Sequence, residues 1–280
     1  MIATGEAGAP ASPSVITLTT DFGARDPYVG EMKGVILAIA AACRRTVQIV
    51  DITHEVARHD VVEGALALEA AAGVFPAATV HVAVVDPGVG TARRALALAA
   101  RGQVFVAPDN GLVTPCLDAG WQAVVLEAAE YRRRTVSRTF HGRDVFAPAA
   151  AHLALGLALD RLGPPLADPV RLPWEDARRR DRVLEGAVLH VDRFGNLVTT
   201  VREAQVTTLG AAATVRIAGR PVPLVGTYGD LRRGQAGALI GSTGRLEIAV
   251  REGSAAARLR ARRGASVVVS PSTSRSRRRA

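Results

Sequence analysis

The sequence predicts two successive domains, an N-terminal α/β domain with a largely parallel sheet and a smaller C-terminal domain built from strands. Three observations carry this prediction. Short β-branched runs alternate with alanine- and leucine-rich stretches up to about residue 162, strand-like runs separated by turns follow residue 186, and the chain between them is rich in proline and charge. A chain of 280 residues is also long for a single hydrophobic core.

The N-terminal domain shows strand and helix patterns in turn. We expect strands at residues 15–19, 47–50, 80–85 and 104–107, and helices at residues 29–42, 61–71 and 145–158. Strands that alternate with helices pair in parallel, because each helix carries the chain back across the sheet. Ligands bind beyond the carboxyl ends of such strands, so the chemistry is expected in the loops at residues 20–28, 86–94 and 108–112.

The C-terminal domain shows only short strand patterns. They fall at residues 186–191, 197–201, 213–217, 221–225, 238–240, 246–250 and 265–269. Many short strands separated by turns are typical of a small barrel or sandwich. The second domain is therefore expected to be all-β.

Composition sets the limits of the domains. Four prolines followed by a charged stretch mark a linker, and the two ends of the chain lack any apolar pattern. The expected organisation is a flexible leader at 1–14, the α/β domain at 15–168, a linker at 169–185, the C-terminal domain at 186–269 and a disordered basic tail at 270–280.

The charge balance does not point to a nucleic-acid partner. The formal net charge is +9, but four arginines lie in the last ten residues, and Lys33 is the only lysine of the chain. A short basic tail without apolar residues is most simply a solvated segment. Nucleic acid is therefore not the expected partner, although a nucleic-acid-binding or nucleotide-binding protein remains one alternative.

Cysteine content and hydropathy indicate the compartment. Cys43 and Cys116 are too few for a disulfide framework and lack the spacing of a zinc or redox pair. The N-terminus lacks the pattern of a signal peptide, and no apolar run approaches the ~18 residues that span a bilayer. A soluble protein of the reducing cytoplasm, with no membrane partner, is expected.

Four polar segments end apolar runs and concentrate carboxylates, glycines and other titratable residues. Taken singly, the segments at residues 19–28, 85–94, 107–112 and 140–148 are each explained by an ordinary turn or helix cap. The pair Gly88 and Gly90 lacks the third glycine of a dinucleotide fingerprint, and the chain has neither a zinc-binding H-E-x-x-H nor a G-x-S-x-G elbow. A phosphate loop, a metal centre and a serine hydrolase site are therefore not expected.

Together, the segments resemble the S-adenosylmethionine hydroxide adenosyltransferase family, relatives of fluorinating and chlorinating enzymes that use the same substrate. The motifs that carry the resemblance are Thr-Thr-Asp-Phe-Gly at 19–23, Val-Asp-Pro-Gly-Val-Gly at 85–90 with the two arginines at 93–94, Ala-Pro-Asp-Asn-Gly at 107–111, Phe-His-Gly-Arg-Asp at 140–144, Asp-Arg-Phe-Gly-Asn at 192–196 and Gly-Ser-Thr-Gly at 241–244. The resemblance implies an α/β domain followed by a β-barrel. It also implies a homotrimer whose active sites lie between one subunit's first domain and a neighbour's second.

The resemblance implies a catalytic set of Asp86, Arg93 and His141. These residues distinguish the water-using members, whereas halogenating relatives carry a tyrosine at the position of Asp86 and a serine at that of Gly142. Water is therefore the expected nucleophile. A halide-dependent adenosyl transferase, a nucleic-acid-binding protein and a non-catalytic adenosine-binding module are the alternatives.

The resemblance also implies the groups that bind the substrate. Asp21 holds the ribose hydroxyls, with Asp26 as a further candidate in the same loop. The implied set in the C-terminal domain is Asn196 for the adenine edge, Phe194 and Tyr228 for the adenine faces, Asp192 for the methionine ammonium and Ser242 for the methionine carboxylate. A carboxylate suits a vicinal diol because it only accepts hydrogen bonds, and an amide offers adenine one donor and one acceptor.

The implied reaction needs no cofactor and no metal. The sulfonium of S-adenosylmethionine already activates C5′, and methionine leaves as a neutral thioether. The protein must align a water opposite the sulfur. Asp86 or His141 can orient or deprotonate this water, so the choice of base stays open. Arg93 can stabilise developing hydroxide character or hold Asp86 ionised.

Overall fold

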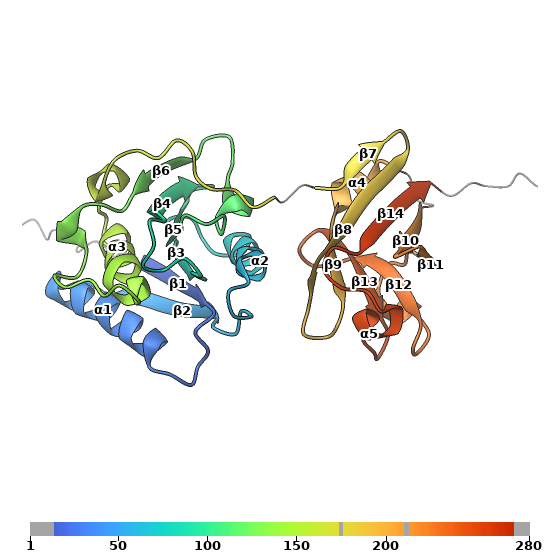
Figure 1. The fold of residues 1–280 in the computed structure, drawn as a ribbon, viewed down its shortest axis with the longest axis horizontal. Coiled ribbons are helices and arrows are strands. Elements are labelled where there is room, and N and C mark those ends of the chain that lie inside the picture. Colours follow the sequence, from blue (N-terminus) through green and yellow to red (C-terminus); the bar gives the residue numbers. More distant parts are fainter. Residues whose placement is uncertain (1–13, 174–175, 210–212, 272–280) are drawn as a thin grey trace, which may run out of the picture. The chain divides into compact units, whose positions relative to one another are not determined.

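The computed structural model describes residues 14–173, 176–209 and 213–271. The chain forms two compact units, the first ending at Leu172 and the second beginning at Pro173. Figure 1 shows an α/β unit and a unit built mainly of strands. The predicted fold class is confirmed.

The first unit is built on a six-stranded sheet with the strand order β2-β1-β3-β5-β4-β6. The strands are β1 (Ser14–Thr20), β2 (Val47–Thr53), β3 (Val80–Val84), β4 (Ala95–Ala100), β5 (Gln103–Pro108) and β6 (Gln122–Val125). The first four strands in the order pair in parallel, while β4 pairs antiparallel with β5 and β6. All strands expected in this unit form, and β4 and β6 are additions.

Helices cover both faces of this sheet. The helices are α1 (Tyr28–Ala42), α2 (Val61–Ala72) and α3 (Ala147–Ala154), with 3₁₀ turns η1 (Thr114–Cys116), η2 (Ala129–Tyr131) and η4 (Leu159–Leu162) and the π-helical turn η3 (Gly142–Phe146). Val82 and Val84 of β3 share a core with α1 and α3, whereas Ala83 and Val85 share one with α2. This alternation explains why the buried strand reads as one continuous apolar run.

The helix expected at residues 145–158 has different limits. The helical path begins at Gly142 as the π-helical turn η3 and continues as α3 only to Ala154. The chain leaves the helix at Leu155, and Gly156 then adopts φ 101°, which favours glycine.

The second unit is a sheet that closes nearly into a barrel. Its strands are β7 (Arg178–Arg180), β8 (Val183–Val191), β9 (Leu197–Arg202), β10 (Ala213–Ile217), β11 (Arg220–Val222), β12 (Ala236–Ile240), β13 (Arg245–Val250) and β14 (Ser266–Pro271), with the short helices α4 (Glu203–Thr207), η5 (Tyr228–Asp230) and α5 (Ala255–Leu259). The order is β11-β10-β14-β8-β9-β13-β12, and β7 pairs with β8. A bridge between Leu224 and Ala238 joins the chain after β11 to β12, the two ends of this order.

The segment expected to be a linker is partly structured. The N–H of Val170 donates to Asp109 Oδ1 at 2.7 Å and the N–H of Leu172 donates to Thr114 Oγ1 at 2.9 Å, within the first unit. Further along, β7 and the first residues of β8 already belong to the second unit. Three consecutive arginines form β7 through backbone pairing at a sheet edge, and such a segment shows no apolar alternation.

The expected tail and leader fall largely outside the described residues. Ser270 and Pro271 belong to β14, and Ser14 begins β1. In the part of the chain that the structure describes, no helix has the length and apolar character needed to cross a membrane.

Candidate active site

A pocket lies at the carboxyl ends of the parallel strands in the first unit. Its volume is about 450 Å³, and it is lined by Asp21, Phe22, Asp26, Tyr28, Arg58, His59, Val84, Asp86, Val89, Thr139, Phe140, His141 and Gly142. Asp21 follows β1 and Asp86 follows β3 after one residue, and these strands are parallel neighbours. The pocket therefore forms where parallel-sheet topology predicts ligand binding.

Asp86, Arg93 and His141 form one hydrogen-bonded cluster at this pocket. Arg93 Nε donates to Asp86 Oδ1 at 3.0 Å and to Oδ2 at 3.1 Å, and Arg93 Nη2 donates to Oδ2 as well. The same Nη2 lies 2.8 Å from Nδ1 of His141. The side chains of Arg93 and Asp86 are only 10% and 5% exposed. A single buried guanidinium thus holds both the carboxylate and the imidazole.

The cluster determines the protonation of His141. A guanidinium can only donate hydrogen bonds, so Nδ1 of His141 accepts and the ring proton lies on Nε2. Burial lowers the pKa of His141, and the positive charge of Arg93 lowers it further. His141 is therefore neutral near pH 7, with Nε2–H as its hydrogen-bond donor.

The loop after β3 places Asp86 through a tight turn. The N–H of Val89 donates to the Asp86 carbonyl at 3.3 Å, and Thr91 Oγ1 donates to the Gly88 carbonyl at 2.7 Å. Gly90 adopts φ 78°, and a Cβ there would lie 2.5 Å from the carbonyl oxygen of Arg138. Only glycine allows this loop to pass so close to the segment that leads to His141.

The ribose candidates Asp21 and Asp26 line the same pocket. Asp21 Oδ2 accepts the backbone N–H of His59 at 2.9 Å, which leaves its other oxygen uncommitted among these contacts. Arg58 and His59 also line the pocket and were missed by the sequence analysis. The sequence feature that could have pointed to them is their position in the loop after the parallel strand β2.

Three predicted residues of the second unit line a separate pocket of about 470 Å³. The lining consists of Phe194, Asn196, Tyr228, Val250, Arg251, Glu252 and Gly253. Phe194 is 77% exposed and Tyr228 is 45% exposed, so both rings offer apolar surface. This surface suits a flat ligand.

Asp192 joins this pocket by hydrogen bonding, whereas Ser242 does not. Asp192 Oδ1 accepts the backbone N–H of Asn196 at 2.8 Å, and Oδ2 accepts Asn196 Nδ2 at 2.9 Å. Ser242 lies exposed in the turn between β12 and β13 and is not part of the lining. Asp192 therefore orients Asn196, and the structure does not bring Ser242 into this group.

Glu247 is a buried carboxylate that the sequence analysis missed. Tyr228 Oη donates to Glu247 Oε2 at 3.1 Å. Burial raises the pKa of Glu247, and burial together with the negative charge of Glu247 raises the pKa of Tyr228 to about 12. The sequence feature that could have pointed to Glu247 is a carboxylate within the apolar run of the buried strand β13.

The described residues contain no group of three or more His, Cys, Asp and Glu side chains placed to hold a metal ion.

Family models match both parts of the chain. The model of the SAM hydroxide adenosyltransferase N-terminal domain matches residues 16–163, and that of the C-terminal domain matches residues 186–268. The chain belongs to the S-adenosylmethionine hydroxide adenosyltransferase family. The family predicted from the ordered motifs is confirmed.

Individual relatives within and around this family differ in similarity. A protein named (R)-S-adenosyl-L-methionine hydrolase from Thermus thermophilus is 43% identical over 247 residues, covering 84% of this chain and 91% of the relative. A fluorinase from Nocardia brasiliensis is 30% identical over 272 residues, covering 84% of this chain and 89% of the relative. The crystal structure of an uncharacterized conserved protein from Thermotoga maritima matches with a TM-score of 0.81 and 33% identity, covering 91% of this chain and 99% of that chain.

Proposed function

We propose that this chain is an enzyme that hydrolyses S-adenosyl-L-methionine to adenosine and L-methionine. The observation that carries the proposal is the partly buried Asp86, Arg93 and His141 cluster at the wall of a pocket. The greater similarity to a protein named as a hydrolase than to a fluorinase supports water as the nucleophile.

The reaction is an in-line displacement at C5′. The oxygen of water forms a bond to C5′, the bond from C5′ to sulfur breaks, and its electron pair stays on the sulfur of methionine. One proton leaves the attacking water. Holding the water and the substrate in line can contribute about 7–11 kcal/mol, so positioning is the main task of the protein.

The hydrogen bonds within the cluster favour Asp86 as the base. Nδ1 of His141 is occupied by Arg93, so the imidazole offers only a donor, Nε2–H. A carboxylate has about four acceptor sites and can still receive a proton from water beside its bonds from Arg93. His141 then orients the water oxygen, and Arg93 aligns both partners.

The remaining predicted residues bind the substrate in this proposal. Asp21 accepts from the ribose hydroxyls through the oxygen that His59 leaves uncommitted, and Asp26 lies at the same pocket. Phe194 and Tyr228 stack on adenine, since their rings are exposed. Asn196, held by Asp192, recognises the adenine edge.

The methionine part of the substrate is proposed to bind the second unit. Asp192 is proposed to hold the ammonium and Ser242 the carboxylate. Ser242 rests on the family resemblance alone, because it lies outside the pocket of the second unit.

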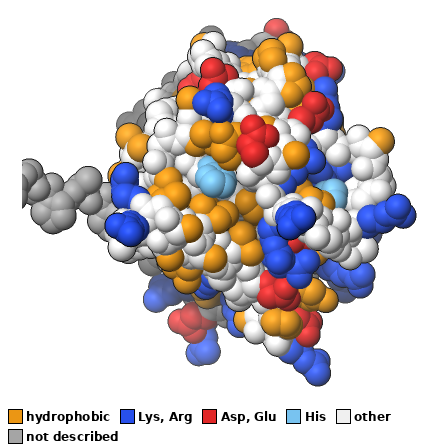
Figure 2. All heavy atoms as spheres, turned by 90° about the vertical axis from the view of Figure 1, so that its left-hand side faces the viewer, with side chains coloured by type: hydrophobic (Ala, Val, Ile, Leu, Met, Phe, Trp, Pro, Cys, Tyr) orange, Lys and Arg blue, Asp and Glu red, His pale blue; other side chains and the backbone are white. Residues whose placement is uncertain are grey.

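We further infer a cofactor-free homotrimer of the cytoplasm. In this proposal, one subunit's first domain supplies the water-activating groups and a neighbour's second domain supplies the adenine-binding groups. Figure 2 shows hydrophobic side chains gathered on a face of the molecule, and Leu37 of α1 is 51% exposed, so apolar surface is available for subunit contacts. The exposed thiol of Cys43 is free, which fits a reducing compartment.

The shared site is tested by mixing two inactive variants. Asp86→Ala and Asn196→Ala subunits are dissociated, mixed and reassociated, and some mixed interfaces should carry both intact halves. Activity above that of either variant alone supports the shared site. Verified mixed trimers without recovery would contradict it.

The proposed reaction is tested by incubating purified protein with S-adenosyl-L-methionine, with and without chloride. Adenosine and methionine should form in equal amounts, and ¹⁸O from labelled water should appear in the 5′-hydroxyl of adenosine. Formation of 5′-chloro-5′-deoxyadenosine would instead support the halide-using alternative. Adenosine binding without turnover would support a non-catalytic binding module, and a salt-dependent nucleic-acid complex without turnover would support a nucleic-acid-binding protein.

A further inference from the structure

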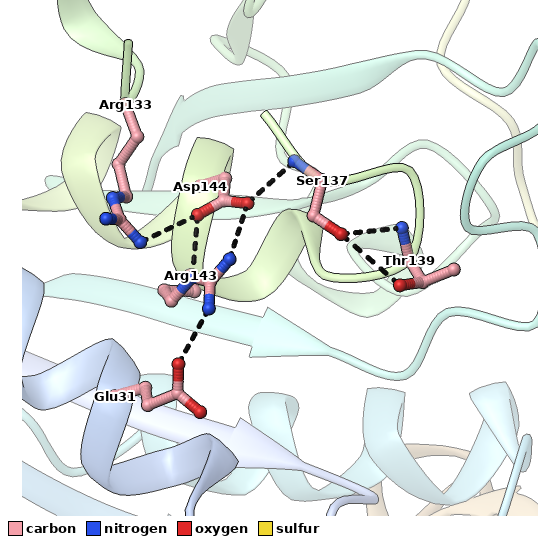
Figure 3. Close-up of polar contacts among 6 residues, drawn as sticks. All are labelled: Glu31, Arg133, Ser137, Thr139, Arg143 and Asp144. Carbon is pink, nitrogen blue, oxygen red and sulfur yellow. Dashed lines mark hydrogen bonds and ion pairs between the residues drawn. The ribbon is translucent and has the colours of Figure 1, made fainter. Parts of the chain in front are cut away.

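Asp144 is a fully buried carboxylate three residues after His141, and the proposed reaction does not use it. Four donors surround its two oxygens (Figure 3). Arg143 Nε and Arg133 Nη1 donate to Oδ1 at 2.7 and 3.2 Å, while the Ser137 N–H and Arg143 Nη2 donate to Oδ2 at 2.8 and 3.0 Å. These bonds match the about four acceptor sites of a carboxylate, so Asp144 has no free site for substrate.

The bonds of Asp144 fix the segment that leads to His141. The backbone N–H of Arg133 donates to the Asp144 carbonyl at 3.0 Å, and the N–H of Asp144 donates to the Phe140 carbonyl at 3.2 Å. Together with the Ser137 contact, they hold the segment at three points. Thr139, Phe140 and His141 lie at its end and line the pocket.

Arg143 also contacts α1 and the aromatic ring of Phe140. Its Nη1 donates to Glu31 Oε2 of α1 at 2.7 Å, and its guanidinium carbon lies 4.9 Å from the centre of the Phe140 ring. Phe140 in turn meets Phe22 and Tyr28 edge to face, with ring centres 6.0 and 5.2 Å apart. Arg143 thus packs against one of three aromatic rings that contact each other and line the pocket.

Asp144 is held in its charged form. Burial alone raises the pKa of a carboxyl group, but the hydrogen bonds from Arg143 and Ser137 outweigh it, so the pKa of Asp144 lies below its ordinary value. The negative charge is thus maintained at neutral pH without contact with the pocket.

We propose that Asp144 is a positioning residue, which acts through Arg143 and the Ser137 N–H to place His141 and Phe140 for the reaction. The inference rests on the proposed function. It adds a residue that touches neither substrate nor water but fixes the groups that do.

The test compares two buried aspartates of the first unit. Asp144→Asn removes the charge and exchanges an acceptor for a donor, at unchanged size. Asp109→Asn does the same to a carboxylate that is 1% exposed and accepts from Arg94 and from the Val170 N–H, but lies outside the pocket lining. Melting temperature, kcat and KM are measured for the parent and both variants.

Both variants are expected to melt at lower temperature, while only Asp144→Asn loses turnover. A displacement of about 1 Å can cost about 10²-fold in rate, so kcat should fall by up to that factor with a smaller change in KM. Equal effects of both variants on kcat would show that Asp144 is merely structural. If Asp144→Asn does not fold, Arg143→Lys keeps the charge but loses the paired donors, and a parental kcat for it would overturn the proposal.

A second measurement separates this inference from the proposed function. Nitrogen NMR of the His141 ring, assigned with a His141→Gln variant, reports the Arg93 contact without any turnover. An inactive parent contradicts the proposed function. An unchanged His141 signal in Asp144→Asn contradicts the positioning role whether or not the parent turns over.

Discussion

The pockets of the two units are built in opposite ways. In the first unit, the side chains of Asp86 and Arg93 are 5% and 10% exposed and hydrogen-bond to one another. In the second unit, Phe194 is 77% exposed and its ring has no aromatic partner among the described residues. A preorganised polar cluster lowers a reaction barrier, whereas an open apolar face gains free energy when a ligand covers it.

The same contrast appears between two consecutive residues. Arg93 contacts Asp86 and His141 at the pocket, while Arg94 pairs with Asp109 and Asp168 away from it. Both side chains form ion pairs of similar length. The location of the partners, and not the length of the ion pair, therefore distinguishes the arginine at the pocket from the arginine beside it.

Breaking the polar cluster should have the largest effect. Asp86→Asn, Arg93→Ala and His141→Ala should each lower kcat by about 10²-fold to 10⁴-fold, because each removes proton transfer or its alignment. Binding of adenosine, measured by calorimetry, should persist. Parental turnover in all three variants would place the chemistry elsewhere.

The pH dependence should sharpen the assignment within the cluster. The Arg93 contact requires neutral His141, whose pKa is lowered by burial and by Arg93. Since the neutral form persists to lower pH than for an ordinary histidine, activity should be retained at pH 6.5 and fall about tenfold per pH unit only below the lowered pKa. An acid limb centred above pH 6.5 would contradict the Nδ1 contact.

Removing the open face should affect binding rather than chemistry. Phe194→Ala should raise KM with little change in kcat, since stacking of a base on an aromatic ring contributes about 1–3 kcal/mol. The melting temperature should stay unchanged, because the ring is 77% exposed. A fall in kcat at constant KM would mean that the second unit takes part in the chemical step.

A buried histidine outside the pocket provides a control for pH effects on stability. Burial lowers the pKa of His81 to about 4, and its ring stacks on Phe105. Below pH 6.5 the His81 ring binds a proton in the unfolded chain but stays neutral in the folded protein. The free energy of unfolding therefore falls as pH decreases from 6.5 toward 4. Urea unfolding should show a loss of about 2 kcal/mol between pH 7 and pH 5 from this residue, and His81→Gln should remove that part of the slope.

The smallest effect is expected at Gly142. A Cβ there would lie 3.2 Å from Met32 Sδ, 3.2 Å from Phe140 Cε2 and 3.3 Å from Phe22 Cε2, so these groups must shift slightly. Gly142→Ala should cost about 1 kcal/mol in the free energy of unfolding. A gain in stability would show that the pocket wall has room for a methyl group at this position.

The sequence predicted the strands well because most of them are short apolar runs between turns. The strand β4 was missed because its sequence Ala-Leu-Ala-Leu-Ala-Ala has helical propensity. Arg101 and Gly102, with φ 54° and 73°, form the hairpin turn that pairs β4 with β5. Tertiary pairing thus decides its conformation.

Individual site residues differ in how far sequence could place them. Asp21 and Asp86 were predictable as neighbours, because they follow adjacent parallel strands. Arg58 was less predictable, since its place in the loop after the parallel strand β2 is the one feature of the sequence that points to the pocket. The four donors of Asp144 come from three separate residues, and their convergence depends on the fold of the segment that precedes η3.

The close approach of Gly90 to the Arg138 carbonyl couples two segments of the chain mechanically. The loop that carries Asp86 and the segment that leads to His141 share this contact, and any side chain at residue 90 would push both apart. A substitution at residue 90 would therefore disturb the loop that carries Asp86 and the segment that carries His141 at the same time.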